Sequence, residues 1–248
     1  ALGLSVCYLN IRPINGNLNL IGAIQGYKEG PSKNLEYFKK AIKSGPIGTP
    51  EVREQVFSLA ARVASMNVSD QVKQDFVSFA YEQIKEQITQ TPDDARYQLF
   101  AGVFFNNVSQ FQLALPYLQK AVELSPNKLT MMFELTKCLM YLGQKEEALK
   151  IAKRAYDLMP VSADAKSNYI SVLILNGDET TAKQLMGSAT TSNEIVVRAY
   201  LVRASGFLQQ GDKTSAIAEV QKAINIAPGF KEQGLQIIQQ ILSGKITE

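Results

Sequence analysis

The sequence predicts an all-α fold, a right-handed superhelix of paired helices (an α-solenoid) with one irregular helical pair and a C-terminal capping helix. Three observations lead to this expectation. Alanines recur with a period of 34 residues, prolines keep the same period, and no segment alternates apolar and polar residues as a half-buried strand would. With two helices in each unit, we expect about thirteen helices.

The alanines fall into two registers. One register holds Ala114, Ala148, Ala182 and Ala216, and the other holds Ala121, Ala155, Ala189 and Ala223. Alanines seven residues apart lie two turns apart on one face of a helix, where small side chains let the backbone of a neighbouring helix come close. Leu118 lies one turn after Ala114 and is expected to fill the space beside it. These residues mark the second helix of each unit.

Prolines mark the ends of the units. Pro126, Pro160 and Pro228 are spaced by 34 residues and by twice 34, and the missing member of the series falls at Glu194. A proline cannot continue a helix, because it lacks the backbone N–H and its ring clashes with the preceding turn. Alanines and prolines together give four regular repeats, at 95–128, 129–162, 163–196 and 197–230.

This pattern resembles the tetratricopeptide repeat, a helix–turn–helix unit of 34 residues. In "RYQLFAGVFFNN", Gly102 and Phe105 stand where that family has its glycine and tyrosine. Glycine followed by aspartate, at 177–178 and at 211–212, is expected to end one helix and to cap the next. The resemblance covers nearly the whole chain and implies a fold that binds other proteins.

The segment before the regular repeats extends the same stack. Residues 15–48 fit a fifth repeat, with Asn34 in place of the usual first alanine. Residues 49–94 are too many for one unit and are interpreted as an irregular helical pair. We expect Thr49 to cap the first helix of this pair, and the second, longer helix to begin after Ser69.

The two ends of the chain have their own interpretations. Residues 231–243 predict a final helix that covers the open end of the stack. Residues 1–14 form an N-terminal stub, whose "ALGLSVCYL" is shorter than the roughly 20 residues that span a bilayer. The stub is either a packed N-terminal helix or the end of a transmembrane helix.

A second resemblance favours the transmembrane interpretation. The segments "NIRP", "LEYFKKAI", "GTPEVREQ" and "TPDDARYQLF" resemble the region that follows the last membrane helix in bacterial or archaeal O-antigen ligase-like, polymerase-type membrane proteins. Members of that group carry a C-terminal tetratricopeptide domain. The resemblance implies a membrane-tethered domain. Basic residues near the expected end of the membrane helix favour the cytoplasmic side, but large domains can cross regardless of charge, so both sides of the membrane stay open. Glycan-transfer residues of that group lie in its membrane part, so no catalytic residue is carried over to this chain.

Composition argues against several kinds of site. The chain has no histidine, and its two cysteines, Cys7 and Cys138, lie far apart. We therefore expect no catalytic residues, no metal site and no cofactor. A net charge of +3 with no dense basic cluster gives no reason to expect a nucleic-acid partner. The adjacent acids Asp93 and Asp94 are interpreted as the N-terminus of a helix.

The first helix of each repeat is expected to line the inner, concave face. The register places Arg96, Leu99, Asn106, Asn107, Phe133, Lys137, Met140, Tyr141, Ser167, Ser171, Ile174, Arg198, Leu201 and Ser205 on this face. Nine of these form the candidate peptide-binding site: Arg96, Asn106, Asn107, Phe133, Lys137, Met140, Tyr141, Ser171 and Arg198. Asparagine can hold a peptide backbone, and large apolar residues can seat side chains. Packing within the stack explains the same residues equally well.

The sequence leaves two hypotheses for function. One is a non-catalytic scaffold within an O-antigen ligase-like membrane protein. The other is a freestanding, cytoplasmic or secreted adaptor that binds an extended peptide in its concave groove. A third hypothesis, an enzyme, is disfavoured because the chain has no histidine and no convergent polar motif. The grip on a C-terminal carboxylate known from one subgroup of the family is also disfavoured, because Leu99 and Val103 stand at places where that subgroup has lysine and asparagine. The sequence names no partner and no oligomeric state.

Overall fold

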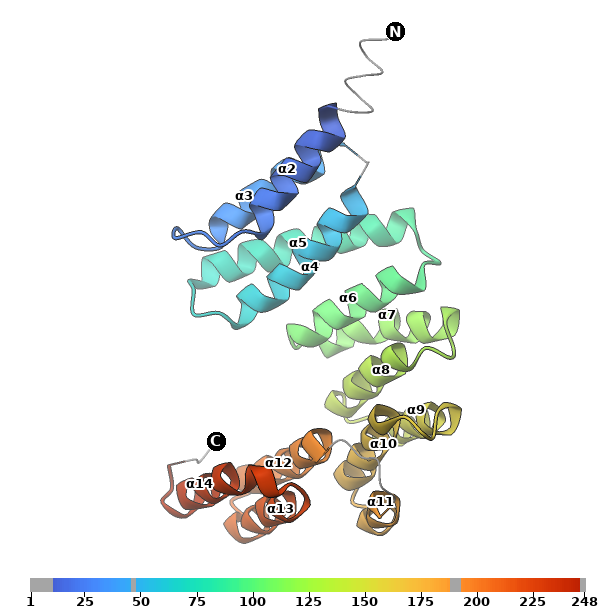
Figure 1. Cartoon of the computed structure of the whole chain (residues 1–248), viewed down its shortest axis with the longest axis vertical. Coiled ribbons are helices and arrows are strands. Elements are labelled where there is room, and N and C mark those ends of the chain that lie inside the picture. The colour runs from blue at the N-terminus through green and yellow to red at the C-terminus, as the bar shows by residue number, and fades with distance from the viewer. Residues whose placement is uncertain (1–10, 46–47, 188–192, 246–248) are drawn as a thin grey trace. The chain divides into compact units, whose positions relative to one another are not determined.

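The computed structural model describes residues 11–45, 48–187 and 193–245 (Figure 1). These ranges contain thirteen α-helices and one short 3-10 helix, and consecutive helices pack in pairs as in a tetratricopeptide-like solenoid. The expected all-α fold is confirmed, whereas the right-handed sense of the superhelix stays a prediction. The chain divides into two compact units, unit 1 (Ala1–Pro126) and unit 2 (Asn127–Glu248).

Unit 1 holds three helical pairs. They are α2 (Arg12–Ile24) with α3 (Ser32–Lys43), α4 (Thr49–Ser65) with α5 (Asp70–Gln90), and α6 (Ala95–Asn107) with α7 (Phe111–Leu124). Contacts of α3 with α4, and of α4 and α5 with α6, join each pair to the next one in chain order. Large side chains from all three pairs, among them Phe38, Phe76 and Phe104, are buried in this stack.

Unit 2 repeats this arrangement and adds a last helix. Its pairs are α8 (Leu129–Tyr141) with α9 (Lys145–Leu158), α10 (Ala163–Asn176) with α11 (Glu179–Met186), and α12 (Asn193–Gln209) with α13 (Lys213–Ile226). The 3-10 helix η2 (Pro228–Phe230) then leads into α14 (Lys231–Leu242), which packs on α13. Ile241 of α14 is fully buried in a cluster with Ala216 and Val220.

The recurring alanines are completely buried wherever the structure describes them. All seven that the structure describes have no exposed surface: Ala114, Ala121, Ala148, Ala155, Ala182, Ala216 and Ala223. Leu118, expected beside Ala114, is also fully buried. Ala189 lies outside the described residues. The complete burial of the described members of both registers agrees with the packing role expected for them.

The prolines end helices as expected, and the gap in their series has a structural consequence. Helices α7, α9 and α13 end two residues before Pro126, Pro160 and Pro228. A residue that precedes proline is disfavoured in the helical conformation, which accounts for this offset. At Glu194, where no proline stands, α12 already begins at Asn193, upstream of residue 197. The first helix of the last repeat is therefore extended at its N-terminus.

Asn34 has a specific role at the alanine position that it replaces. Its Nδ2 donates hydrogen bonds to the carbonyl oxygens of Ala23, at 2.7 Å, and of Gln25, at 2.6 Å. The last carbonyl groups of a helix lack partners within the helix. Asn34, which is only 6% exposed, supplies donors at the C-terminus of α2 and so connects α2 to α3.

A buried arginine connects the helices of the irregular pair. Arg53 of α4 is 3% exposed, and its guanidinium donates to the side-chain oxygens of three glutamines of α5. Arg53 Nη1 lies 2.8 Å from Gln87 Oε1 and 3.0 Å from Gln90 Oε1, and Nε lies 3.3 Å from Gln83 Oε1. Burial lowers the pKa of Arg53 from its ordinary value. Neutral amides, rather than a carboxylate, satisfy these donors.

The caps expected at Asp178 and Asp212 and the helix start expected after Ser69 are correct, whereas the cap expected at Thr49 is wrong. Ser69, Asp178 and Asp212 accept hydrogen bonds from backbone N–H groups of the helices that follow them. Thr49, by contrast, is the first residue of α4, and the cap position belongs to Gly48, with φ of 83°. The Thr49 hydroxyl donates to the carbonyl oxygen of Gly45 at 2.7 Å instead of accepting from the helix. The chain turns through Gly48 because glycine adopts this left-handed conformation without strain.

The interpretation of residues 1–14 falls mostly outside the described residues, which begin at Ile11. Arg12 is the first residue of α2. Among the helices that the structure describes, none combines the length and the apolar character needed to cross a membrane.

Candidate functional site

Unit 2 contains a groove formed by the first helices of its three pairs. It is an open cavity of about 420 Å³, within the size range of ligand sites. Helices α8, α10 and α12 supply all but one of its lining residues, and the other is Lys145 at the start of α9. This unit 2 groove is lined by Thr136, Lys137, Met140, Tyr141, Lys145, Asn168, Ser171, Val172, Leu175, Ile195, Arg198, Ala199, Val202 and Arg203.

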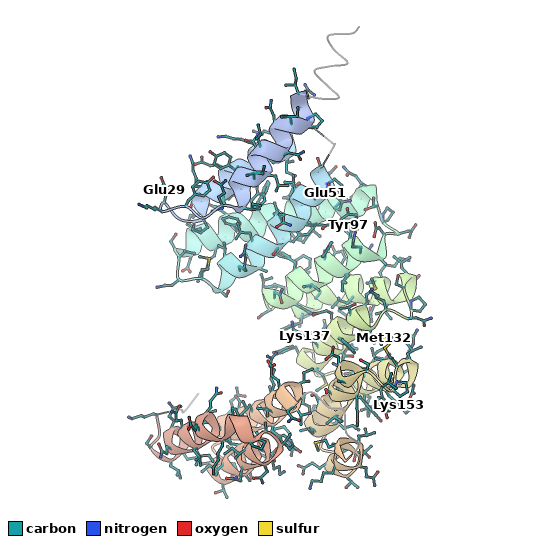
Figure 2. All side chains as sticks on the ribbon, in the orientation of Figure 1. Glu29, Glu51, Tyr97, Met132, Lys137 and Lys153 are labelled. Carbon is teal, nitrogen blue, oxygen red and sulfur yellow. The ribbon has the colours of Figure 1, made fainter. Side chains whose placement is uncertain are left out.

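The charged residues of the unit 2 groove are all basic. Lys137, Lys145, Arg198 and Arg203 line it, and no aspartate or glutamate does. Lys137 extends from α8 away from the buried Met132 (Figure 2). A charged molecule that enters the groove therefore meets positive charge on helices α8 and α12 and at the start of α9.

Two of these cations have acidic neighbours on their own helices. Lys137 Nζ lies 3.7 Å from Glu134 Oε2, and Arg198 Nη2 lies 3.6 Å from Glu194 Oε1. Arg198 and Glu194 are more than three-quarters exposed, and the Lys137–Glu134 pair is partly exposed. Exposed pairs of this kind contribute at most about 1 kcal/mol. A ligand carboxylate can therefore compete for either cation.

Arg203 belongs to a tighter ionic cluster behind the groove. Its Nη1 lies 2.7 Å from Glu179 Oε1, and its Nε lies 3.5 Å from Glu219 Oε2. Lys222 Nζ completes the cluster at 2.7 Å from Glu179 and 2.8 Å from Glu219. Hydrogen bonds from Lys222 and Arg203 lower the pKa of Glu179. This ionic cluster connects α11, α12 and α13 and holds Arg203 in a fixed orientation.

Polar groups of the groove have unused hydrogen-bonding capacity. Thr136 is 1% exposed, and its Oγ1 has no hydrogen-bond partner among the described residues. The buried Oδ1 of the half-buried Asn168 has none either. A buried polar atom without a partner is costly, by about 1–3 kcal/mol. The hydroxyl of Ser171 is engaged, since it donates to the carbonyl oxygen of Ile195 at 3.2 Å and thereby joins α10 to α12.

The groove also exposes apolar surface. Tyr141 is 64% exposed and Val202 is 51% exposed, although both are large hydrophobic residues. Met140, Val172 and Leu175 belong to the same lining. Large side chains that stay open to solvent beside polar groups are typical of surfaces that bind a partner.

The structure brings together five of the nine predicted site residues. Lys137, Met140, Tyr141, Ser171 and Arg198 line the unit 2 groove. Phe133 is half-buried on α8 and is not part of the lining. Arg96, Asn106 and Asn107 belong to unit 1.

The predicted residues of unit 1 lie in different environments. Arg96 stacks on the ring of Tyr97, with its Cζ 4.7 Å from the ring centroid, and its Nη1 lies 3.5 Å from Glu54 Oε1. Asn106 is only 3% exposed and offers little surface to a ligand. Asn107 is exposed and lines a separate cavity of about 540 Å³ between α4 and α6, whose charged residues are one acid, Glu54, and one base, Arg62.

Sequence reasoning missed residues that only the fold brings to the groove. Thr136, Lys145, Asn168, Val202 and Arg203 were not among the candidates, although they line it. Lys145 belongs to a second helix, and the strict register pointed to Leu201 and Ser205 rather than to Val202 and Arg203. The missing proline at 194 could have indicated that α12 begins early enough to bring Ile195 to the lining, whereas no signal in the sequence points to Val202 or Arg203.

No metal or thiol chemistry is evident in the part of the chain that the structure covers. Among residues 11–45, 48–187 and 193–245, no group of three or more Cys, Asp or Glu is arranged to hold a metal ion. Burial raises the pKa of the Cys138 thiol to about 11, so that the thiol stays protonated at neutral pH. Cys138 is thus a small apolar residue of the core.

Comparison with known proteins identifies a repeat in the sequence. Residues 197–230 match the tetratricopeptide repeat family. They coincide with the last of the four repeats expected from the alanine and proline spacing. No curated protein matches the chain in sequence.

Solved structures share the fold at low sequence identity. A double mutant of MamA from strain RS-1 is 16% identical, with 77% of this chain and 94% of that chain covered and a TM-score of 0.55. A MamA fragment from Desulfovibrio magneticus RS-1 is 17% identical, with coverages of 69% and 90% and a TM-score of 0.52. YrrB, described as a TPR protein with an unusual peptide-binding site, is 16% identical, with coverages of 82% and 97% and a TM-score of 0.50.

These likenesses establish a tetratricopeptide-repeat fold for the chain. They give no support to the resemblance to O-antigen ligase-like proteins, and that resemblance therefore rests on the quoted sequence segments alone.

Proposed function

We propose that this chain, with its tetratricopeptide-repeat fold, is a non-catalytic protein-interaction module that binds an extended peptide segment in the unit 2 groove. The observation that carries the proposal is the combination of exposed apolar side chains, Tyr141 and Val202, with the exposed polar side chains of Lys145 and Arg198 in one lining. A peptide offers both kinds of group at regular spacing along its length.

The exposed polar groups suit a peptide backbone. The ammonium group of Lys145 and the guanidinium group of Arg198 can donate to peptide carbonyl oxygens. Thr136 Oγ1 and Asn168 Oδ1 lack partners within the described chain but are shielded from solvent, so a ligand reaches them only if the lining rearranges.

The apolar side chains suit the side chains of the same ligand. Tyr141 and Met140 on α8 and Val202 on α12 lie in one lining. Burial of apolar surface contributes about 25 cal/mol for each Å² removed from water. YrrB, the similar structure that is described as having a peptide-binding site, adds support by likeness of fold. The hypothesis of a peptide-binding adaptor is thus better supported than that of a scaffold within an O-antigen ligase-like membrane protein, which the groove does not require.

The proposal is tested by selection from a library of random peptides about ten residues long, roughly 33 Å when extended. The purified chain serves as bait, and the affinity of each recovered peptide is then measured by fluorescence anisotropy. We expect to recover peptides that bind the Val202→Ser variant about tenfold more weakly than the native chain, because this substitution removes apolar surface from the groove.

The matched control is Val161→Ser, which makes the same change in the same unit at a residue that is 84% exposed and outside the groove lining. It should leave the affinity unchanged. If no peptide is recovered, or if both variants bind every recovered peptide as the native chain does, the unit 2 groove is not a peptide site.

A further inference from the structure

We infer that the unit 2 groove selects acidic peptide segments, in which aspartate or glutamate side chains flank a large apolar residue. This inference rests on the proposed function and names the chemical class of its ligand. The inference rests on the charge of the groove, because four basic residues and no acidic residue line it.

A second cavity of the protein has a different charge pattern. The cavity between α4 and α6 in unit 1 is lined by Glu54 and Arg62, so its charges balance. In the unit 2 groove the acids Glu134 and Glu194 lie beside the cations but are absent from the lining. A ligand in the groove therefore faces the cations rather than their partners.

Three of the four cations are available to a ligand. Lys145 is exposed and makes no ion pair within the described chain. Among the described residues, Lys137 has only the partly exposed pair with Glu134 at 3.7 Å, and Arg198 has only the exposed pair with Glu194 at 3.6 Å, so a ligand carboxylate can replace either partner at little cost. Arg203 is held by Glu179 and Glu219 and contributes a fixed wall of the groove instead of a free donor.

The placement of these cations fits side chains on either side of an apolar anchor. Lys137 and Lys145 flank Met140 and Tyr141 at the end of α8, and Arg198 lies one turn before Val202 on α12. Carboxylates near the anchor would meet Lys137, Lys145 or Arg198, whereas lysine or arginine at those places would be repelled. The groove thus discriminates by attraction and by repulsion.

A single-stranded nucleic acid is the other anionic occupant to consider, and the groove fits it less well. Nucleic-acid grooves track a phosphate backbone with many cations, whereas only three are available here and the chain has a net charge of +3. Most residues of the lining are neutral. Both features favour a peptide.

The test compares three random peptide libraries with the same apolar residues and different polar residues, which are Asp and Glu, Asn and Gln, or Lys and Arg. An oligothymidylate of matching length forms a fourth probe. Affinities are measured on the native chain and on Lys145→Glu, with Lys150→Glu on the exposed face of α9 as the matched control. Circular dichroism and thermal melting verify that both variants fold.

We expect the acidic library to bind at least about tenfold tighter than the other two, and to lose about tenfold in Lys145→Glu but not in Lys150→Glu. Binding to acidic peptides should also weaken as salt is added. Equal or tighter groove-dependent binding of the neutral or basic library overturns the acidic preference while the peptide-binding function stands. Tighter binding of the oligothymidylate assigns the groove to nucleic acid and overturns the inference. If no library binds in a manner sensitive to Val202→Ser, the peptide-binding function itself fails, and the inference fails with it.

Discussion

Gly102 of α6 packs so closely against Leu118 of α7 that a Cβ atom on Gly102 would overlap Cγ and Cδ2 of the leucine. Leu118 is fully buried and therefore has no room to move away. The glycine is what allows the two helices of this pair to approach each other, because any larger residue would separate them.

We therefore predict that Gly102→Ala destabilises the protein. Alanine favours a helix over glycine by about 1 kcal/mol, but overpacking of a filled core costs about 1–3 kcal/mol, so the net change should be unfavourable. The free energy of unfolding is measured in urea. The control is Gly206→Ala in α12, where an added Cβ meets nothing within 4 Å, and this change should stabilise by about 0.5–1 kcal/mol. A stabilising effect of both substitutions would show that α6 and α7 adjust freely.

Asn34→Ala restores the residue that the repeat normally carries, yet we predict a loss of stability. The change leaves the carbonyl oxygens of Ala23 and Gln25 without the Asn34 donor, at a cost of about 1–3 kcal/mol. Asn34→Asp should be at least as destabilising, because it keeps the shape while it replaces the donor by a buried charge. Urea unfolding measures both variants, and wild-type stability of Asn34→Ala would contradict the assigned role.

Arg53→Lys should not preserve the function of the buried arginine. A guanidinium donates along several fixed directions, and here it reaches Gln83, Gln87 and Gln90 at once. A lysine ammonium cannot reproduce this geometry, and Gln87, which is 2% exposed, would lose its donor. We expect a loss of about 1–3 kcal/mol in unfolding free energy. As a control, Arg62→Lys on the same helix, where the side chain is exposed, should have little effect. An unfolding free energy of Arg53→Lys equal to that of the native chain would contradict this prediction and would show that water replaces the missing contacts.

Stability should fall in acid in a manner that depends on Glu179. Its folded-state pKa is lower than the ordinary value because Lys222 and Arg203 donate hydrogen bonds to the carboxylate. A group with a depressed folded pKa contributes stability that is complete above its unfolded pKa, about 4.3, and that is lost as the pH falls through the folded pKa. Glu179→Gln should therefore be less stable near neutral pH and should lose less stability on acidification.

The measurement is the unfolding free energy of the native chain and of Glu179→Gln between about pH 7 and pH 3. Glu147→Gln, on an exposed residue of α9, serves as the control and should follow the native curve. If the unfolding free energies of the native chain and of Glu179→Gln fall in parallel as the pH is lowered, Glu179 does not contribute to the loss of stability in acid.

The sequence predicted the repeated packing of this protein well because that packing depends on local chemistry. An alanine that must face a neighbouring helix, such as Ala114, recurs at the repeat period, and a proline such as Pro126 ends a helix wherever it stands. The cap at Thr49 was misplaced by one residue. The hydroxyl of a threonine can donate as well as accept, and only the position of Gly45 decided that it donates.

The sequence by itself determined the all-helical class, the period of the helical pairs and five of the residues that line the unit 2 groove. The tertiary structure alone decided which other side chains join them, since α12 presents Val202 and Arg203 rather than Leu201 and Ser205 to the lining. It also decided which polar atoms lack partners, such as Thr136 Oγ1, and which cations are tied to acids, such as Arg203 to Glu179. The physical reason is that the periodicity of a helix depends on residues close together in the sequence. Burial, hydrogen-bond and ion pairing, and the charge of a groove depend on residues that are distant in the sequence.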